Sequence, residues 1–225
     1  MNIKPIAYYQ SPLKSKFGVP RQSGIATHLV GKIVMEKEWN NPECLRGLED
    51  FDYLWILWGF SANVDSPKHS TVRPPRLGGN RRMGVFATRS SFRPNNIGIS
   101  AVRILSLTIF PGKPIEIEVS GADLMNGTPI YDIKPYLPEF DAHPNARGGF
   151  ASSEKWEKLQ VEIPDEIRQH LGEENSRLVE QLLSEDPRPH YHNDPERVYG
   201  MTVDCFDIRF QVVENTAKII HIDLF

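Results

Sequence analysis

Short runs of alternating apolar and polar residues dominate the first 120 positions of this 225-residue chain. β-Branched and aromatic residues fill most of the runs, which is typical of half-buried strands. No long helical period occurs before about residue 150. Parallel βαβ units need such helices, so we expect a mainly β fold whose antiparallel sheet curls into a barrel or a sandwich. The predicted strands cover residues 3–9, 28–35, 51–60, 84–88, 97–110 and 115–119.

The pattern changes after residues 143–153, HPNARGGFASS, which are small, polar and rich in glycine. Such a composition is typical of a linker, so we expect one domain at residues 1–145 and a small α+β domain at residues 151–225. In the second domain, Pro164 and Asp165 mark the start of a helix that Gly172 interrupts or divides. Its predicted strands cover residues 158–163, 198–213 and 217–225.

Composition narrows the class of protein. The net charge of −3 argues against a surface that coats nucleic acid indiscriminately. No run approaches the roughly 18 apolar residues of a membrane-spanning helix, and the N-terminus lacks a secretory signal, so we expect a cytoplasmic protein. Cys44 and Cys205 have no second pair at metal-ligand spacing, so we expect neither a metal site nor a disulfide framework.

An all-arginine cluster lies between residues 73 and 103. It contains seven arginines and no Asp, Glu or Lys. Guanidinium groups bind carboxylate and phosphate in bidentate fashion, so the cluster suits a confined anionic ligand or a short piece of RNA backbone. On charge alone, a solvated positive face is the commoner explanation.

Four polar segments separate the predicted elements, at residues 19–22, 72–100, 121–136 and 186–191. The chain has no glycine-rich dinucleotide loop, P-loop, nucleophile elbow or HExxH helix. Proline, glycine and asparagine set turn geometry with or without a ligand. A turn does not require Arg89 and Arg93 around Phe92, however, and that arrangement suits stacking on a purine and binding of an anion.

The same four segments carry a family resemblance across essentially the whole chain. PRQ, MGVFATRSSFRPNNIGIS, NGTP followed by DIKPY, and DPRPHY occur in this order. They resemble the TsaA-like family of tRNA methyltransferases, also called TrmO. The resemblance implies a single-sheeted β-barrel that binds S-adenosylmethionine, usually in a homodimer, and a C-terminal domain that helps to hold tRNA. The implied reaction methylates N6 of N6-threonylcarbamoyladenosine at anticodon-loop position 37 of threonine tRNA.

Motif by motif, the resemblance also implies a set of cofactor-binding residues. Relatives carry His-Gln where this chain has Ser61-Ala62, a proline where it has Asn96, and an aspartate where it has Asn126. Backbone contacts could survive the first change, but side-chain contacts could not. The cofactor-binding residues implied are Pro20, Arg21, Gln22, Ser61, Ala62, Arg89, Phe92, Arg93, Ile99, Asp123, Leu124, Asn126, Gly127 and Thr128.

Substrate binding and proton removal are assigned by residue type within these motifs. We expect the threonyl carboxylate and nearby phosphates to bind Arg73, Arg76 or Arg82. Lys134 is expected to meet an anion, whereas Arg188 and Tyr191 are expected to bind tRNA through phosphate and base contacts. The candidates for the base that accepts the N6 proton are Asp132, Tyr136 and Asp186. An Asp132–Lys134 structural ion pair is nearly as good an explanation of those two residues.

Two other functions remain open at this point. The Ser61-Ala62 and Asn96 departures would also suit a module that binds S-adenosylmethionine or tRNA without catalysis. A methyltransferase acting on a small adenine-containing metabolite is the third possibility.

Overall fold

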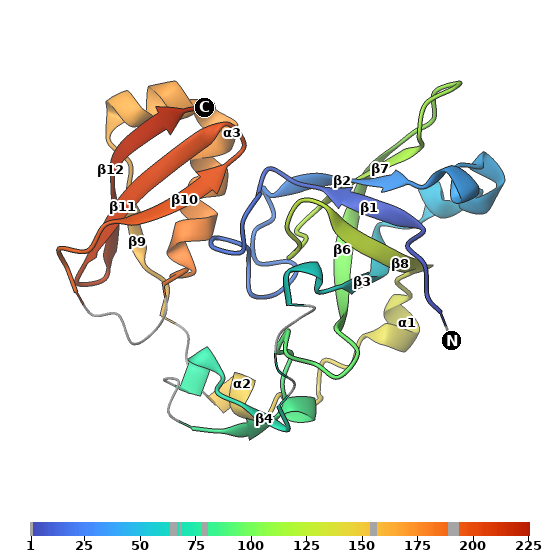
Figure 1. Cartoon of the computed structure of the whole chain (residues 1–225), viewed down its shortest axis with the longest axis horizontal. Coiled ribbons are helices and arrows are strands. Elements are labelled where there is room, and N and C mark those ends of the chain that lie inside the picture. The colour runs from blue at the N-terminus through green and yellow to red at the C-terminus, as the bar shows by residue number, and fades with distance from the viewer. Residues whose placement is uncertain (1, 64–66, 68, 78–80, 154–156, 189–193) are drawn as a thin grey trace.

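Six antiparallel strands close into a single-sheet barrel in the computed structural model, which describes residues 2–63, 67, 69–77, 81–153, 157–188 and 194–225 (Figure 1). The strand order around the barrel is β1-β2-β7-β6-β3-β8, and every neighbouring pair is antiparallel. The strands are β1 (Ala7–Gln10), β2 (Val30–Met35), β3 (Tyr53–Gly59), β6 (Ile97–Thr108), β7 (Glu116–Ser120) and β8 (Thr128–Pro135). The closed barrel confirms the mainly β fold class and rules out the sandwich.

Alternate side chains of the strands fill the barrel interior, as the two-residue period of a strand requires. On β3, Leu54 and Ile56 are fully buried and Trp58 is 6 % exposed. Tyr9 of β1 is also fully buried. Because the sheet closes on itself, these strands leave no unpaired edge around the barrel.

Short elements outside the barrel replace the strand predicted at residues 84–88, so that prediction was wrong. Only β5 pairs there, with β4, and a 3₁₀ turn follows. Thr88 Oγ1 and Arg93 Nη1 donate hydrogen bonds to the Val85 carbonyl, at 2.9 and 3.4 Å, and so stabilise the turn instead of an extended strand. The short elements are η1 (Lys37–Trp39), η2 (Pro42–Leu45), η3 (Leu48–Asp50), η4 (Ser61–Asn63), β4 (Thr71–Val72), η5 (Pro75–Leu77), β5 (Met83–Gly84), η6 (Val85–Ala87), α1 (Pro138–Asp141) and α2 (Phe150–Ser153).

The segment 121–136, which the sequence suggested was a polar loop, contains barrel strand β8. This strand pairs with β1 on one side and with β3 on the other. Its prolines, Pro129 and Pro135, lie at the two ends of the strand, where a missing N–H costs least. The polar loop is therefore limited to the turn before Thr128.

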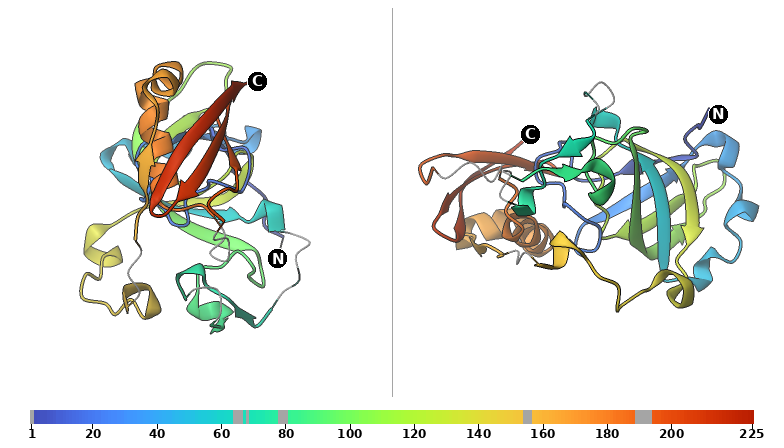
Figure 2. Two further views of the ribbon diagram at one scale, coloured as in Figure 1. Left: turned by 90° about the vertical axis from the view of Figure 1, so that its left-hand side faces the viewer. Right: turned by 90° about the horizontal axis from the view of Figure 1, so that it is seen from below.

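The C-terminal part is an α+β unit, as expected. Its sheet has the order β10-β11-β12-β9, and α3 packs on one face of it (Figure 2). Gly172 interrupts α3 with φ 73°, which confirms the predicted break. The single strand predicted at residues 198–213 is two strands, because Asp204 adopts φ 55° and forms a tight turn between them. The elements are β9 (Gln160–Glu162), α3 (Asp165–Ser184), β10 (Tyr199–Val203), β11 (Phe206–Val213) and β12 (Thr216–Leu224).

The connection between β1 and β2 packs into the core of this C-terminal unit. Leu13, Ala26 and Leu29 are at most 1 % exposed and share one hydrophobic cluster with α3 and β10–β12. At Gly18, where φ is 93°, a Cβ atom would lie 2.4 Å from Met201 Sδ. The chain's N-terminal and C-terminal parts are therefore joined by a shared core. No helix among the described residues has both the length and the hydropathy to cross a membrane.

Candidate functional site

Three of the four motif segments meet around Asp123. The Gly24 N–H, two residues beyond the first segment, donates to the Gly121 carbonyl at 2.8 Å, which brings the first segment next to the third. The backbone N–H of Ser23 donates to the Asp123 carboxyl, and Arg89 of the second segment acts on it electrostatically. The residues that the family motifs single out therefore converge in space although they are up to about 100 positions apart in the chain.

Asp123 is a carboxyl group held in a largely buried place. Ser100 Oγ donates to its Oδ1 at 2.5 Å, and Trp58 Nε1 donates to Ser100 Oγ at 2.9 Å. Burial is the largest influence and raises the pKa of Asp123, whereas the hydrogen bonds and the charge of Arg89 act in the opposite direction. Burying a carboxyl group costs folding free energy, so its presence here favours a binding role over a structural one.

Gln22 and Arg89 form a second contact at the same place. Arg89 Nη1 donates to Gln22 Oε1 at 2.6 Å, and Gln22 Nε2 donates to the Arg21 carbonyl at 2.6 Å. Arg89 is exposed, so its remaining N–H groups face solvent or a ligand. Pro20, next in this segment, is buried.

Ser61 and Ala62 lie in η4, directly after β3, and both are exposed. The Ala62 carbonyl accepts a hydrogen bond from Lys16 Nζ at 2.8 Å. The backbone at Ser61-Ala62, where the chain departs from the family pattern, therefore contacts the β1–β2 connection.

Residues 124–128 tie the third segment to the β1–β2 connection. Asn126 Oδ1 accepts from Ser11 N at 3.1 Å, and Gly127 N donates to the Tyr9 carbonyl at 2.8 Å. Gly127 has φ 78°, which a side chain would strain. Thr128 is buried and its Oγ1 donates to the Met125 carbonyl, while Leu124 is 1 % exposed. These contacts hold the loop in shape around Asp123.

Two of the cofactor-binding residues predicted in the second segment are exposed, and a third donates hydrogen bonds to the protein's own backbone. Phe92 is 42 % exposed, and Ile99 on the outer face of β6 is 57 % exposed. Arg93 Nη1 instead donates to the Thr88 carbonyl at 2.7 Å, as well as to that of Val85. Arg93 thus braces the backbone beside Arg89.

Asp132 and Lys134 form an ion pair of 3.3 Å on the outer face of β8. Their side chains are 46 % and 64 % exposed. Tyr136, just beyond the strand, packs against the rings of Trp55 and Tyr53 at centroid distances of 5.6 and 6.2 Å. The structural ion pair anticipated from the sequence is present.

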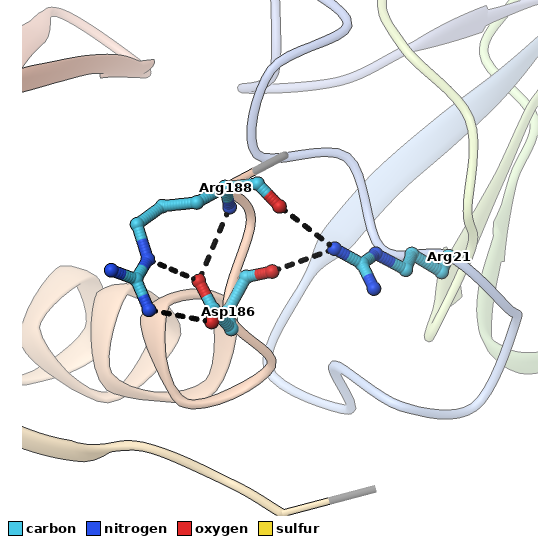
Figure 3. A network of polar contacts seen from close by, with 3 residues as sticks. All are labelled: Arg21, Asp186 and Arg188. Carbon is cyan, nitrogen blue, oxygen red and sulfur yellow. Dashed lines mark hydrogen bonds and ion pairs between the residues drawn. The ribbon is translucent and has the colours of Figure 1, made fainter. Parts of the chain in front are cut away.

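The DPRP segment contacts the first segment through Arg21 (Figure 3). Arg21 Nη2 donates to the carbonyls of Asp186 and Arg188, at 2.8 and 3.3 Å. Arg188 in turn binds both carboxyl oxygens of Asp186, at 2.7 and 2.9 Å, and this pair is only 12 % and 17 % exposed. The three residues form one network between the C-terminal unit and the site around Asp123.

The arginine cluster is divided among several places. Val72 of β4 lies opposite Met83 of β5, so Arg73 and Arg82 occupy neighbouring positions at one end of this hairpin, and both are exposed. Arg82 Nη1 donates to Thr71 Oγ1 at 2.8 Å. Arg103 lies on barrel strand β6. The side chain of Arg76, and Tyr191 as a whole, lie outside the described part of the chain.

Trp58, Ser23 and Lys16 join the site although they lie outside the four motif segments, and Ser100 joins it as the last residue of the second segment, where no role was predicted for it. Trp58 and Ser100 occupy inward positions of β3 and β6, and the two-residue period could have placed them inside. Their contact with Asp123 depends on strand register, which the sequence alone does not reveal.

The described residues contain no group of three or more His, Cys, Asp or Glu side chains that could hold a metal ion.

Known proteins resemble this chain along nearly its whole length. The model of the tRNA-methyltransferase O N-terminal domain matches residues 8–142, and that of the TrmO C-terminal domain matches residues 156–224. A relative from Escherichia coli named tRNA (adenine(37)-N6)-methyltransferase is 38 % identical over 217 residues, 93 % of this chain and 92 % of that protein. A Pseudomonas aeruginosa relative named putative S-adenosylmethionine-dependent methyltransferase RcsF is 37 % identical over 216 residues, 93 % of this chain and 91 % of that protein.

The fold agrees with these sequence matches. A crystal structure of TrmO from Pseudomonas aeruginosa superposes with a TM-score of 0.78 at 30 % identity, covering 99 % of this chain and 98 % of that one. Both family models and this superposition together cover nearly the whole chain, and the chain belongs to the tRNA-methyltransferase O family.

Proposed function

We propose that this chain is an S-adenosylmethionine-dependent tRNA methyltransferase that methylates N6 of N6-threonylcarbamoyladenosine at position 37, in the anticodon loop of threonine tRNA. The observation that carries the proposal is the largely buried Asp123 carboxyl, surrounded by the three segments that the family motifs define. The names of the relatives support the enzyme class and the cofactor. The threonylcarbamoyl group and the tRNA species come from the family resemblance.

The chemistry of the site fits the cofactor. Asp123 is an acceptor suited to an amino or hydroxyl donor, and Arg89 is an exposed cation suited to a carboxylate. The half-exposed ring of Phe92 suits stacking on a purine. When bound, S-adenosylmethionine supplies a methyl group on a sulfonium centre, and these residues would hold it by its polar ends.

Positioning is the main task of the protein in this reaction. The N6 nitrogen of the substrate is conjugated to the purine and to a carbonyl, so its lone pair is a poor nucleophile. Good alignment of two reactants contributes roughly 7–11 kcal/mol over a bimolecular encounter. The neighbouring exposed arginines, Arg73 and Arg82, suit binding of the threonyl carboxylate or a phosphate next to the modified base.

Asp132 is the candidate base that we place first. Both oxygens of Asp186 bind Arg188, so proton transfer to Asp186 would break a partly buried ion pair. Tyr136 packs against two aromatic rings. Asp132 is 46 % exposed, and its carboxyl has a 3.3 Å surface pair with Lys134 and accepts a hydrogen bond from the Ile133 N–H at 3.0 Å, contacts that cost less to give up than a partly buried ion pair. We expect Asp132→Asn to lower kcat far more than it weakens cofactor binding.

We also propose a homodimer that uses the outer face of β3 and β6. Tyr53 and Leu105 are each 44 % exposed there, and Ile99 is 57 % exposed. Exposed apolar side chains on neighbouring strands are typical of an interface. Light scattering should give a dimer mass for the wild type and a lower mass for Leu105→Glu.

The activity is tested with purified full-length protein, labelled S-adenosylmethionine, and tRNA from cells that lack this methyltransferase. We expect label in threonine tRNA, located by mass spectrometry on N6-threonylcarbamoyladenosine, and none in a transcript without the threonylcarbamoyl group. If calorimetry detects cofactor binding while every tRNA stays unlabelled, the non-catalytic module is the better explanation. Label in a small adenine-containing metabolite but not in tRNA would favour the third function.

A further inference from the structure

A chain of hydrogen bonds runs from the barrel interior to Asp123. Trp58 of β3 donates through Nε1 to Ser100 Oγ of β6 at 2.9 Å, and Ser100 Oγ donates to Asp123 Oδ1 at 2.5 Å. Trp58 is 6 % exposed and Ser100 is 1 % exposed. Neither side chain is therefore placed to touch a ligand bound at the site.

The direction of this chain follows from the chemistry of its members. An indole N–H can only donate, so Ser100 Oγ must accept from it and direct its own single proton to Asp123. The backbone N–H groups of Asp123 and Ser23 lower the pKa of the carboxyl. An ionised carboxylate has about four acceptor positions, and Ser100 occupies one of them, which leaves acceptor capacity for a ligand donor.

The geometry of the chain is set by rigid strands. Trp58 lies opposite Gly98 in the β3–β6 pairing, two residues before Ser100. An alanine at position 98 would place its Cβ atom 2.5 Å from the Trp58 ring, so the indole lies directly over that glycine. The indole therefore has little freedom to move away from Ser100.

We propose that Trp58 and Ser100 are positioning residues, which hold the Asp123 carboxyl in the orientation that accepts an amino or hydroxyl donor of the cofactor. The proposal rests on the proposed function, since it assumes that Asp123 contacts the cofactor. It adds two residues that act on cofactor affinity through Asp123 alone.

Calorimetric titration of the full-length protein with S-adenosylhomocysteine tests the proposal. Hydrogen bonds to charged groups imply a loss of affinity of about 10- to 100-fold for Asp123→Asn. Ser100→Ala and Trp58→Phe should each weaken binding about 3- to 30-fold, and Ser100→Thr, which keeps the hydroxyl, should stay within about 3-fold of the wild type. In the Asp123→Asn background, Ser100→Ala and Trp58→Phe should add less than about 2-fold, because residues that act through Asp123 lose their effect with it.

Two matched controls separate positioning from general destabilisation. Ser120→Ala removes the hydroxyl of another buried serine, on β7, and Trp39→Phe alters a tryptophan of η1 that is 43 % exposed. Both should bind the ligand like the wild type. A second readout is the indole N–H resonance of Trp58, assigned by its loss in Trp58→Phe. Ligand addition should shift this resonance in the wild type and leave it unmoved in Asp123→Asn.

The outcomes distinguish this inference from the proposed function. If Asp123→Asn weakens binding but Ser100→Ala and Trp58→Phe do not, or if their effects are fully additive with it, the positioning role is refuted and the cofactor site stands. If Asp123→Asn binds like the wild type, Asp123 is not in the cofactor site, and both the inference and the proposed site fail.

Discussion

The substitution Arg21→Met tests how the C-terminal unit is joined to the site. The substitution keeps the aliphatic part of the side chain and removes the hydrogen bonds to Asp186 O at 2.8 Å and to Arg188 O at 3.3 Å. A hydrogen bond with a charged partner contributes about 1.5–3 kcal/mol, and the longer bond counts for less. We therefore expect the contact to weaken by about 2 kcal/mol, which corresponds to about 30-fold in an equilibrium constant.

Hydrogen exchange followed by mass spectrometry measures this effect where it arises. Amides of residues 181–188 should exchange about 30-fold faster in Arg21→Met, while those of β3 and β6 keep the wild-type rate. Arg46→Met is the matched control, because Arg46 is 75 % exposed and its bond to Glu43 is a surface pair. Unchanged exchange at residues 181–188, or an equal acceleration throughout the barrel, would refute the role of Arg21 at this interface.

Three further predictions concern single positions. Asn96 has φ 52°, and its N–H donates to Arg93 O. Asn96→Pro, which introduces the residue usual in the family, should therefore lower the free energy of unfolding by about 3 kcal/mol or more, whereas Asn96→Gly should be nearly neutral. Urea titrations compare the two variants, and a neutral proline variant would contradict this backbone conformation. Gly18→Ala combines a left-handed φ with a Cβ atom 2.4 Å from Met201 Sδ, so it should lower the free energy of unfolding by about 2–4 kcal/mol in the same titration. A decrease below about 0.5 kcal/mol would show that Met201 does not lie next to Gly18. Burial raises the pKa of Asp123 above its ordinary 3.8, so the folded state holds the proton more tightly than the unfolded state, and this contribution to stability is lost as pH rises through the folded pKa. Melting curves without cofactor should therefore show Asp123→Asn to be more stable than the wild type at pH 7, and the difference should vanish toward pH 3. A difference independent of pH would argue against a buried carboxyl.

The alternation of apolar and polar residues was enough to locate most barrel strands, but not β8. Residues 51–60 read as a strand because Leu54, Ile56 and Trp58 recur with the period of two that a half-buried strand needs. The prolines and the charged pair of β8 suggested a loop, although the prolines only bracket the strand. At residues 198–213 the buried positions change from odd to even numbers between Val203 and Phe206, and the left-handed backbone of Asp204 turns the chain at this change.

The candidate site was predictable in part for similar reasons. The motifs identified the segments around Asp123, because short strings of polar and glycine residues are local in the sequence. Trp58, Ser100 and Asp123 are contributed by different elements, and their contact depends on the register of β3 against β6. Register is a property of the whole sheet, and no local pattern encodes it.

The shared core of the β1–β2 connection and the C-terminal unit bears on how the chain folds during synthesis. Leu13 and Leu29 pack with Met201, Phe210 and other residues made about 170 to 200 positions later. Until the ribosome has released that distant part, these apolar side chains have no native partner and are exposed to aggregation or to chaperones. Contacts so far apart in sequence also slow folding, because a long loop must close before they form. We expect a chain cut at the linker to keep these side chains exposed, and we therefore expect the two predicted domains to fold together.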